Sequence, residues 1–292
     1  MATESYKLGL QAIFVLAVLE CLLQGVLIPM SLTSFKASSA NEKPLWFKVY
    51  VLGINGLGLT QTILVIAQGF YTIDGTPGPD MPMHTCTLLT PIIAALVQLF
   101  FIYRCWVIFN KQLLPAVILL SLLIISFTSG FVAVLSYPGW IPSIPFEKRW
   151  IPTIICLVNS IVLDAIVTFS SKSIDSIVFL HNTREGLNKH EGVIERIWQI
   201  LWISSAPSFI LLVGATINEA VPERKFYMTA IFTTISAKTY ELSLMSSIVG
   251  QGYIRRKIEQ SWPRVSHGLT ERNGAGEPMF ALEVNLLLIR FD

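Results

Sequence analysis

Hydrophobic residues in this chain gather into long apolar runs, and polar, proline-rich or glycine-rich segments separate them. About 20 apolar residues in a helix cross the ~30 Å hydrocarbon core of a bilayer. The pattern therefore predicts an all-α, seven-transmembrane helix bundle, with the first run read as a span and not as a cleaved leader. The expected spans are Gly9–Leu32, Leu45–Phe70, Leu88–Phe109, Leu113–Ser136, Trp150–Ser171 (continuing as a helix to about Leu180), Val193–Ile217 and Phe226–Val249.

The segments between the runs carry strong turn signals. Asp74–Asp80 is built from Gly, Pro, Thr and Asp, and Tyr137–Arg149 contains three prolines. A basic cluster, Arg255–Lys257, follows the last run and stops transfer across the membrane. These boundaries predict a seven-span membrane domain at residues 1–258 and a disordered cytoplasmic tail at residues 259–292.

Composition supports a membrane environment. Hydrophobic residues make up 53% of the chain and charged residues only 14%, whereas soluble domains are about 25% charged. So few charges cannot cover a water-exposed surface, but lipid as the surrounding solvent removes that requirement. The net charge of +2 is too small to indicate nucleic acid. The predicted partner is the lipid bilayer of a plasma membrane or endomembrane.

Lysine and arginine placement predicts the orientation of the bundle. More than twice as many basic residues lie on the side of the membrane where spans 1, 3, 5 and 7 end as on the side where they begin. Positively charged loops stay in the cytoplasm. We therefore expect the N-terminus outside or lumenal and the C-terminus in the cytoplasm, as the lack of any basic residue in Asp74–Asp80 also suggests.

Ionisable residues inside the spans are the strongest candidates for function, because each costs at least ~2.5–3.5 kcal/mol at the bilayer centre. Glu20, Asp164 and Lys238 each lie about 11–14 residues into their spans, or ~16–21 Å deep. Gln98 reaches a similar level, and Glu241 lies nearly one turn beyond Lys238 on the same helix face. All five are therefore expected near the midplane of the bilayer.

Two interpretations of these five residues remain open. They form a polar midplane pocket in which Lys238 pairs with Glu20, Asp164 or Glu241, or they form a buried ion pair that only fixes helix register. The cysteines and histidines add no metal site, because neither has ligand spacing. No cofactor is predicted. A bridge between Cys86 and Cys156 is conceivable, although buried free thiols are the commoner outcome.

Known seven-helix classes match only in part. Lys238 is well placed for retinal, but span 3 contains no acidic counter-ion. Rhodopsin-like receptors carry Asp-Arg-Tyr after span 3, where this chain has Tyr103-Arg104-Cys105. Membrane terpene cyclases use intramembrane carboxylates, for which Glu20 and Asp164 could serve as proton donor and partner. The Asn-x-x-Trp-Glu type motif of that class is absent.

Several segments together resemble one further family. The stretch from Val97 to Trp106 fits the pattern Val-Gln-x-Phe-Phe-x-x-Arg-x-Trp, and Asp164 fits an acidic position in span 5. Thr183–Ile197 is similar to the cytoplasmic segment before span 6, and Ala237–Leu244 to Lys-x-Tyr-x-Asn-Ser-Leu, with leucine replacing asparagine. The chain thus resembles the basidiomycete seven-helix membrane proteins classed as a domain of unknown function. The resemblance implies the fold and supplies no activity.

The sequence supports two functional hypotheses. The first is a non-enzymatic, receptor-like protein that binds a small apolar or amphipathic molecule through Glu20, Gln98, Asp164, Lys238 and Glu241. The rival is a membrane-embedded terpenoid cyclase or isomerase that uses Glu20 and Asp164. A transporter is a weaker third option, because the spans show no inverted repeat.

Overall fold

The computed structural model describes the residues that form the helical bundle, together with the turn between two helices. These residues are 2–37, 45–73, 81–108, 111–136, 150–183, 206–219 and 226–261. Within them the chain is helical and contains no strand. The labelled helices are α1 (Ala2–Ala37), α2 (Leu45–Ile73), α3 (Met81–Ile108), α4 (Leu113–Ser136), α5 (Trp150–Thr183) and α7 (Phe226–Ser261).

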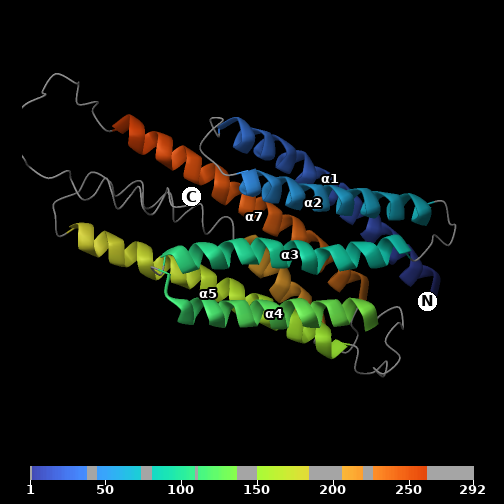
Figure 1. Ribbon diagram of the computed structural model, residues 1–292. Helices are drawn as coiled ribbons and strands as arrows, with labels where there is room; N and C mark the ends of the chain where they lie inside the picture. Colours follow the sequence, from blue (N-terminus) through green and yellow to red (C-terminus); the bar gives the residue numbers. More distant parts are fainter. Residues whose placement is uncertain are drawn as a thin grey trace, which may run out of the picture.

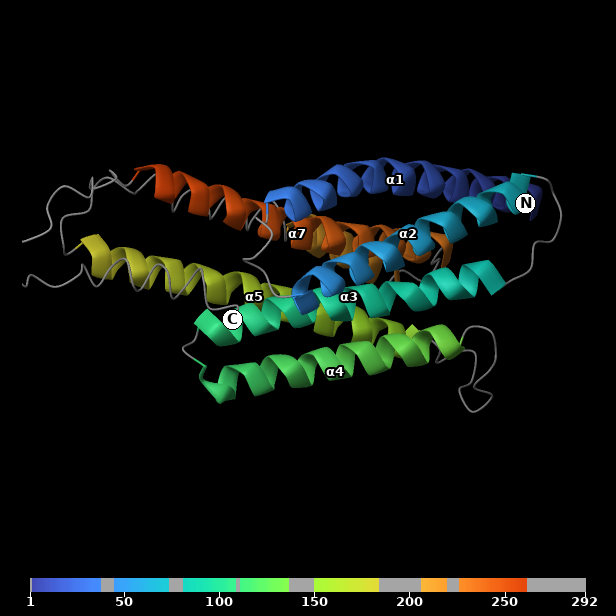
Figure 2. The same cartoon turned by 45° about the horizontal axis from the view of Figure 1, so that its top comes forward.

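A further helical segment, residues 206–219, lies between α5 and α7 in the chain and brings the described helices to seven. The all-α bundle expected from the apolar runs is therefore confirmed. Odd-numbered helices run in one direction and α2 and α4 in the other, as Figures 1 and 2 show. Orientation relative to a membrane stays a prediction from lysine and arginine placement.

Helix boundaries agree best at α4 and at the end of α5. The expected span Leu113–Ser136 coincides with α4, and α5 continues to Thr183, close to its expected end. In contrast, α1, α3 and α7 extend well beyond their apolar runs. Apolar length reports only the hydrocarbon-crossing part of a helix, whereas backbone hydrogen bonds continue into polar residues.

Two segments expected from the sequence lie partly outside the residues that the structure describes. The tail predicted from residue 259 begins inside α7, which ends at Ser261, and its later residues lie outside the described ranges. Residues 193–205 of the sixth expected span also lie outside them. Just before α4, Lys111 adopts a left-handed conformation with φ 62°, and its amide donates to the Trp106 carbonyl near the end of α3.

Among the residues that the structure describes, five helices are long and apolar enough to cross a membrane, so the chain is a multi-pass, membrane-type helical protein. The stretches are Gln11–Thr33, Leu45–Tyr71, Thr85–Val107, Leu113–Ser136 and Trp150–Thr168. Large apolar side chains cover their outer surfaces, including Leu22, Leu114 and Leu52, each more than 60% exposed. Contiguous exposed apolar surface of this kind fits contact with lipid.

Helix α7 is the interior helix of the bundle and is not among those five apolar stretches. It packs against α1, α2 and α3, and every side chain from Ser236 to Glu241 is buried. The many serine, threonine and charged residues of α7 lower its hydropathy. Because neighbouring helices surround them, these polar groups find partners in the protein and not in lipid. The bundle therefore concentrates its buried polar chemistry around α7.

Candidate functional site

Helix α7 directs Lys238 and Tyr240 to opposite sides. Two residues correspond to about 200° around a helix of 3.6 residues per turn. Lys238 accordingly contacts α1 and α2, whereas Tyr240 contacts α3 and α5. The buried polar residues around α7 therefore form two separate clusters.

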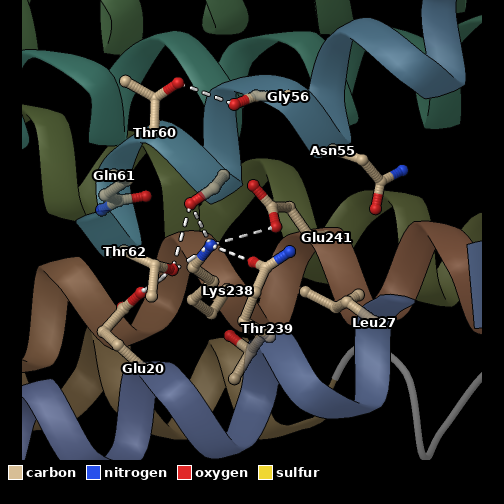
Figure 3. Close-up of polar contacts among 12 residues, drawn as sticks. Glu20, Leu27, Asn55, Gly56, Thr60, Gln61, Thr62, Lys238, Thr239 and Glu241 are labelled. Carbon is tan, nitrogen blue, oxygen red and sulfur yellow. Dashed lines mark hydrogen bonds and ion pairs between the residues drawn. The ribbon is translucent and has the colours of Figure 1, made fainter. Parts of the chain in front are cut away.

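The first cluster surrounds the Lys238 ammonium group (Figure 3). Lys238 Nζ donates to Gln24 Oε1 at 2.8 Å and to the Gly58 carbonyl oxygen at 2.5 Å. It also lies 3.5 Å from Glu241 Oε2 and 3.7 Å from Glu20 Oε2. We call this group the Lys238 cluster, and it comprises Glu20, Gln24, Gly58, Thr62, Lys238 and Glu241.

Helical spacing explains how α1 and α7 contribute to the cluster. Glu20 and Gln24 are four residues apart and therefore share one face of α1, while Lys238 and Glu241 are three apart on α7. Glu20, Lys238 and Glu241 are all 0% exposed. Charges so fully removed from water are tolerated only when they are paired and hydrogen-bonded. The cluster therefore joins α1, α2 and α7 electrostatically.

Gly58 provides the α2 side of the cluster. Its carbonyl oxygen accepts from Lys238 and, at 3.1 Å, from the Thr62 hydroxyl, which is also 3.1 Å from Glu20 Oε2. A Cβ atom at position 58 would lie 2.0 Å from Glu241 Oε1 and 2.2 Å from Glu241 Oε2. The missing side chain is thus what lets the Glu241 carboxylate approach the α2 backbone.

Three glycines lie close together in the first half of α2, and only one of them allows a close helix approach. Gly58 does so, whereas a Cβ atom at Gly53 or Gly56 would meet nothing within 4 Å. Both are exposed on the outer side of α2. The sequence alone does not distinguish the three glycines. The side of α2 on which each one lies decides whether it contacts another helix.

Hydrogen-bond acceptors outnumber donors at the Lys238 cluster. Glu20 Oε1 and Glu241 Oε1 are buried and lack a hydrogen-bond partner, and so does Oε1 of Gln61, which neighbours the cluster on α2. The Gln61 amide nitrogen is held by Thr90 at 3.1 Å, and Gln61 lies one turn after Gly58 on α2. Each of the three helices thus presents one unsatisfied acceptor. Such groups normally have a partner, so each requires an explanation.

The second cluster, which we call the Asp164 cluster, joins α3, α5 and α7. Tyr240 donates its hydroxyl to Asp164 Oδ2, and Gln98 Nε2 lies 3.1 Å from Asp164 Oδ1 and 3.3 Å from the Tyr240 hydroxyl. Asp164 is half-buried, while Gln98 and Tyr240 are buried. Both carboxylate oxygens have a donor. This cluster is therefore satisfied as it stands and acts as a tie between helices.

The segments that carry the family resemblance meet in space. Gln98 and Arg104, both in the Val97–Trp106 stretch of α3, contact Tyr240 and Ser247 of α7. Arg104 also lies over the Phe100 ring, with its Cζ 5.9 Å from the ring centroid. These residues hold α3 and α7 together along their length.

The five residues predicted from sequence divide between the two clusters. Lys238, Glu20 and Glu241 lie together as expected, whereas Gln98 and Asp164 belong to the Asp164 cluster on the other side of α7. Of the three carboxylates offered as partners for Lys238, Glu20 and Glu241 pair with it, and Asp164 pairs with Tyr240. The five residues were predicted at one level, but they lie at different positions around the axis of α7 and so belong to two clusters.

Sequence reasoning missed four participants, namely Gln24, Thr62, the Gly58 carbonyl and the Tyr240 hydroxyl. Gln24 carried a usable signal, because it lies four residues after Glu20 in an otherwise apolar run. Tyr240 carried one too, since its offset of two residues from Lys238 directs it to the opposite side. Thr62 and the Gly58 backbone carried none, because their roles depend on the rotation of α2.

The cysteines form no bridge. All four are free thiols: Cys86 contacts the Gln61 carbonyl at 3.8 Å, and Cys156 lies beside Ser126. Among the described residues no group of three or more His, Cys, Asp or Glu side chains is arranged to hold a metal ion.

Comparison of the chain with protein-family models, curated proteins and solved structures found no match. Any functional conclusion therefore rests on the geometry of the two clusters.

The Asp164 cluster gives a first prediction. We expect Tyr240→Phe to lower the stability of the bundle by about 1–3 kcal/mol, because the Asp164 carboxylate loses a donor away from bulk water. The midpoint of unfolding in a denaturing detergent measures the change. Tyr71→Phe, at an exposed tyrosine of α2, is the control and should change stability by less than about 0.5 kcal/mol. Equal effects at the two tyrosines would contradict the assignment.

Proposed function

We propose that this chain is a multi-pass membrane protein, receptor-like in topology, that binds a small apolar or amphipathic molecule at the Lys238 cluster. The observation that carries the proposal is the set of unsatisfied oxygens on Glu20, Gln61 and Glu241, all 0% exposed. A purely structural ion pair is stable when its remaining lone pairs are satisfied. Here they are not, which favours a ligand that supplies the missing donors.

The position of α1 supports a route for such a ligand. Helix α1 packs against α2 and α7, and large apolar side chains of its outer face, such as Leu19, Leu22 and Val26, are exposed. A molecule dissolved in the bilayer would reach the cluster by parting α1 from α2. A membrane protein whose ligand arrives through lipid has no need of a water-filled entrance. We further propose kinship with the basidiomycete family, on the motif residues given above.

Native mass spectrometry after purification in a mild detergent tests the binding. We expect a small-molecule adduct of defined mass on the wild type that is lost in Gly58→Ala and in Thr62→Val, which disturb the cluster on α2. Gly56→Ala and Thr60→Val are matched controls on the outer side of the same helix, where Thr60 bonds only to its own helix, and they should retain the adduct. A wild type that carries only detergent and bulk lipid would overturn the proposal.

The rival cyclase hypothesis makes a different demand on the fold. It uses Glu20 and Asp164 on one substrate, yet these carboxylates share no partner and belong to clusters on opposite sides of α7. No observation favours that reaction over binding. Incubation of the reconstituted protein with prenyl diphosphates and analysis of the products tests it. The binding proposal expects no turnover, and any turnover abolished by Asp164→Asn would overturn it in favour of the enzyme.

A further inference from the structure

We propose that the ligand of the Lys238 cluster binds through a positively charged ammonium group and is a lipophilic amine. This inference rests on the proposed function and deepens it, because it assigns a chemical class to the ligand. It follows from the charge, the hydrogen-bond inventory and the surroundings of the cluster, which we take in turn.

Acidic side chains outnumber basic ones at the cluster. Helix α1 contributes the carboxylate of Glu20, and α7 contributes the ammonium of Lys238 and the carboxylate of Glu241. The residues by which α2 joins the site, Gly58 and Thr62 together with the neighbouring Gln61, carry no charge. Two carboxyl groups therefore face one ammonium group, and a buried carboxylate without a cation beside it is strongly unfavourable. A cationic ligand would pair with the second carboxyl group as a carboxylate, whereas an anionic ligand would add a further negative charge.

The hydrogen-bond inventory indicates the same class of ligand. The unsatisfied atoms in the cluster and at the neighbouring Gln61 are all acceptors, namely Glu20 Oε1, Glu241 Oε1 and Gln61 Oε1. No side-chain donor of the Lys238 cluster is buried without a partner. A primary ammonium group carries three N–H donors and no acceptor, which equals the number of unsatisfied acceptors. Hydrogen bonds between an ammonium group and carboxylates are also about twice as strong as neutral ones.

The structure already contains one example of this recognition. The Lys238 ammonium group is itself held by an amide oxygen, a backbone carbonyl and two carboxylates. Each carboxylate turns one oxygen toward Lys238 and leaves the other without a donor. A second ammonium group would use those second oxygens, so that Glu20 and Glu241 would each bridge two cations. The side chain of Lys238 thereby prepares the carboxylates for an amine of the same chemistry.

The surroundings of the cluster select an apolar body for the ligand. On the buried face of α1, the apolar residues Leu16 and Leu27 lie on either side of Glu20 and Gln24. The outer face of α1 is also apolar. A water-soluble ammonium compound would leave its polar body without partners in this environment. An alkyl chain beside the ammonium group instead meets the hydrocarbon of the helices and of the bilayer.

A series of three amphiphiles with one chain length tests the inference. Tetradecylamine, tetradecanol and tetradecanoic acid are each titrated into the full chain in nanodiscs of uncharged lipid, and the unfolding temperature is recorded. We expect the amine to stabilise the protein saturably, the alcohol to do so weakly and the acid not at all. Glu20→Gln and Glu241→Gln should each raise the amine concentration needed for half-maximal stabilisation at least tenfold, since each replaces a carboxylate by a neutral amide. Gly56→Ala and Thr60→Val should leave it unchanged.

The outcomes separate this inference from the proposed function. If the alcohol or the acid stabilises as well as the amine and loses its effect in Glu20→Gln, binding at the cluster stands and the cationic ligand is wrong. If the amine stabilises every variant equally, it acts through the bilayer and the inference fails. The buffer salt is choline chloride. If its replacement by sodium chloride, without amine, stabilises the protein as the amine does, the site takes a metal cation and the organic ligand is wrong. If no amphiphile acts and no adduct copurifies, both proposals fail.

Discussion

Lys238→Met is expected to destabilise the bundle by about 3–5 kcal/mol, the usual cost of breaking a buried ion pair from one side. The substitution keeps the length of the side chain but removes the cation between Glu20 and Glu241. Two carboxylates then face each other in a region that water does not reach. The midpoint of unfolding in denaturing detergent, for protein purified from the same membranes, measures the loss.

Two further variants make the Lys238 prediction specific. Lys48→Met, at the start of α2 and outside the cluster, removes one positive charge and should cost less than about 0.5 kcal/mol. Lys238→Met combined with Glu241→Gln should recover part of the stability, because the repulsion between the carboxylates is gone. An effect of Lys238→Met no larger than that of Lys48→Met would show that the ammonium group contributes nothing as a buried partner.

The second large effect is expected at Gly58. In Gly58→Ala the new Cβ atom would lie 2.0 Å from Glu241 Oε1, so α2 and α7 must separate or the Glu241 carboxylate must leave the cluster. We expect a loss of about 1–3 kcal/mol, typical of an overpacked interior. Gly56→Ala, two residues away in open space, should be neutral or slightly stabilising because alanine favours the helix.

A double-mutant cycle checks the cause of the Gly58 effect. Glu241→Ala removes the group that the new methyl would meet, so Gly58→Ala should cost much less in that background. We expect a coupling of about 0.5–3 kcal/mol, the range for residues in direct contact. Additive effects would mean that the Gly58 methyl acts through something other than Glu241. The cycle needs only unfolding midpoints and no knowledge of a ligand.

The sequence predicted that Glu20 and Lys238 share one level of the bundle, for a simple physical reason. Charged side chains are too costly in lipid to occur at random, so Glu20 and Lys238 stand out in their apolar runs, and the constant rise of a helix places them at one level. Their pairing followed from that level. Asp164 was at the same level and was assigned to the same pocket, but it lies on the Tyr240 side of α7.

What the sequence by itself determined is the class of fold and the level at which the ionisable residues lie along their helices, because apolar length and the cost of charge in lipid are local properties of the chain. It could not determine how each helix is rotated about its axis, since lipid-facing and protein-facing surfaces are both apolar here. Only the tertiary structure decided that rotation. It turned Gly58 and Thr62 inward and Gly56 and Thr60 outward. The same packing divided one expected pocket into two clusters on opposite sides of α7 and left the unsatisfied oxygens with the Lys238 cluster.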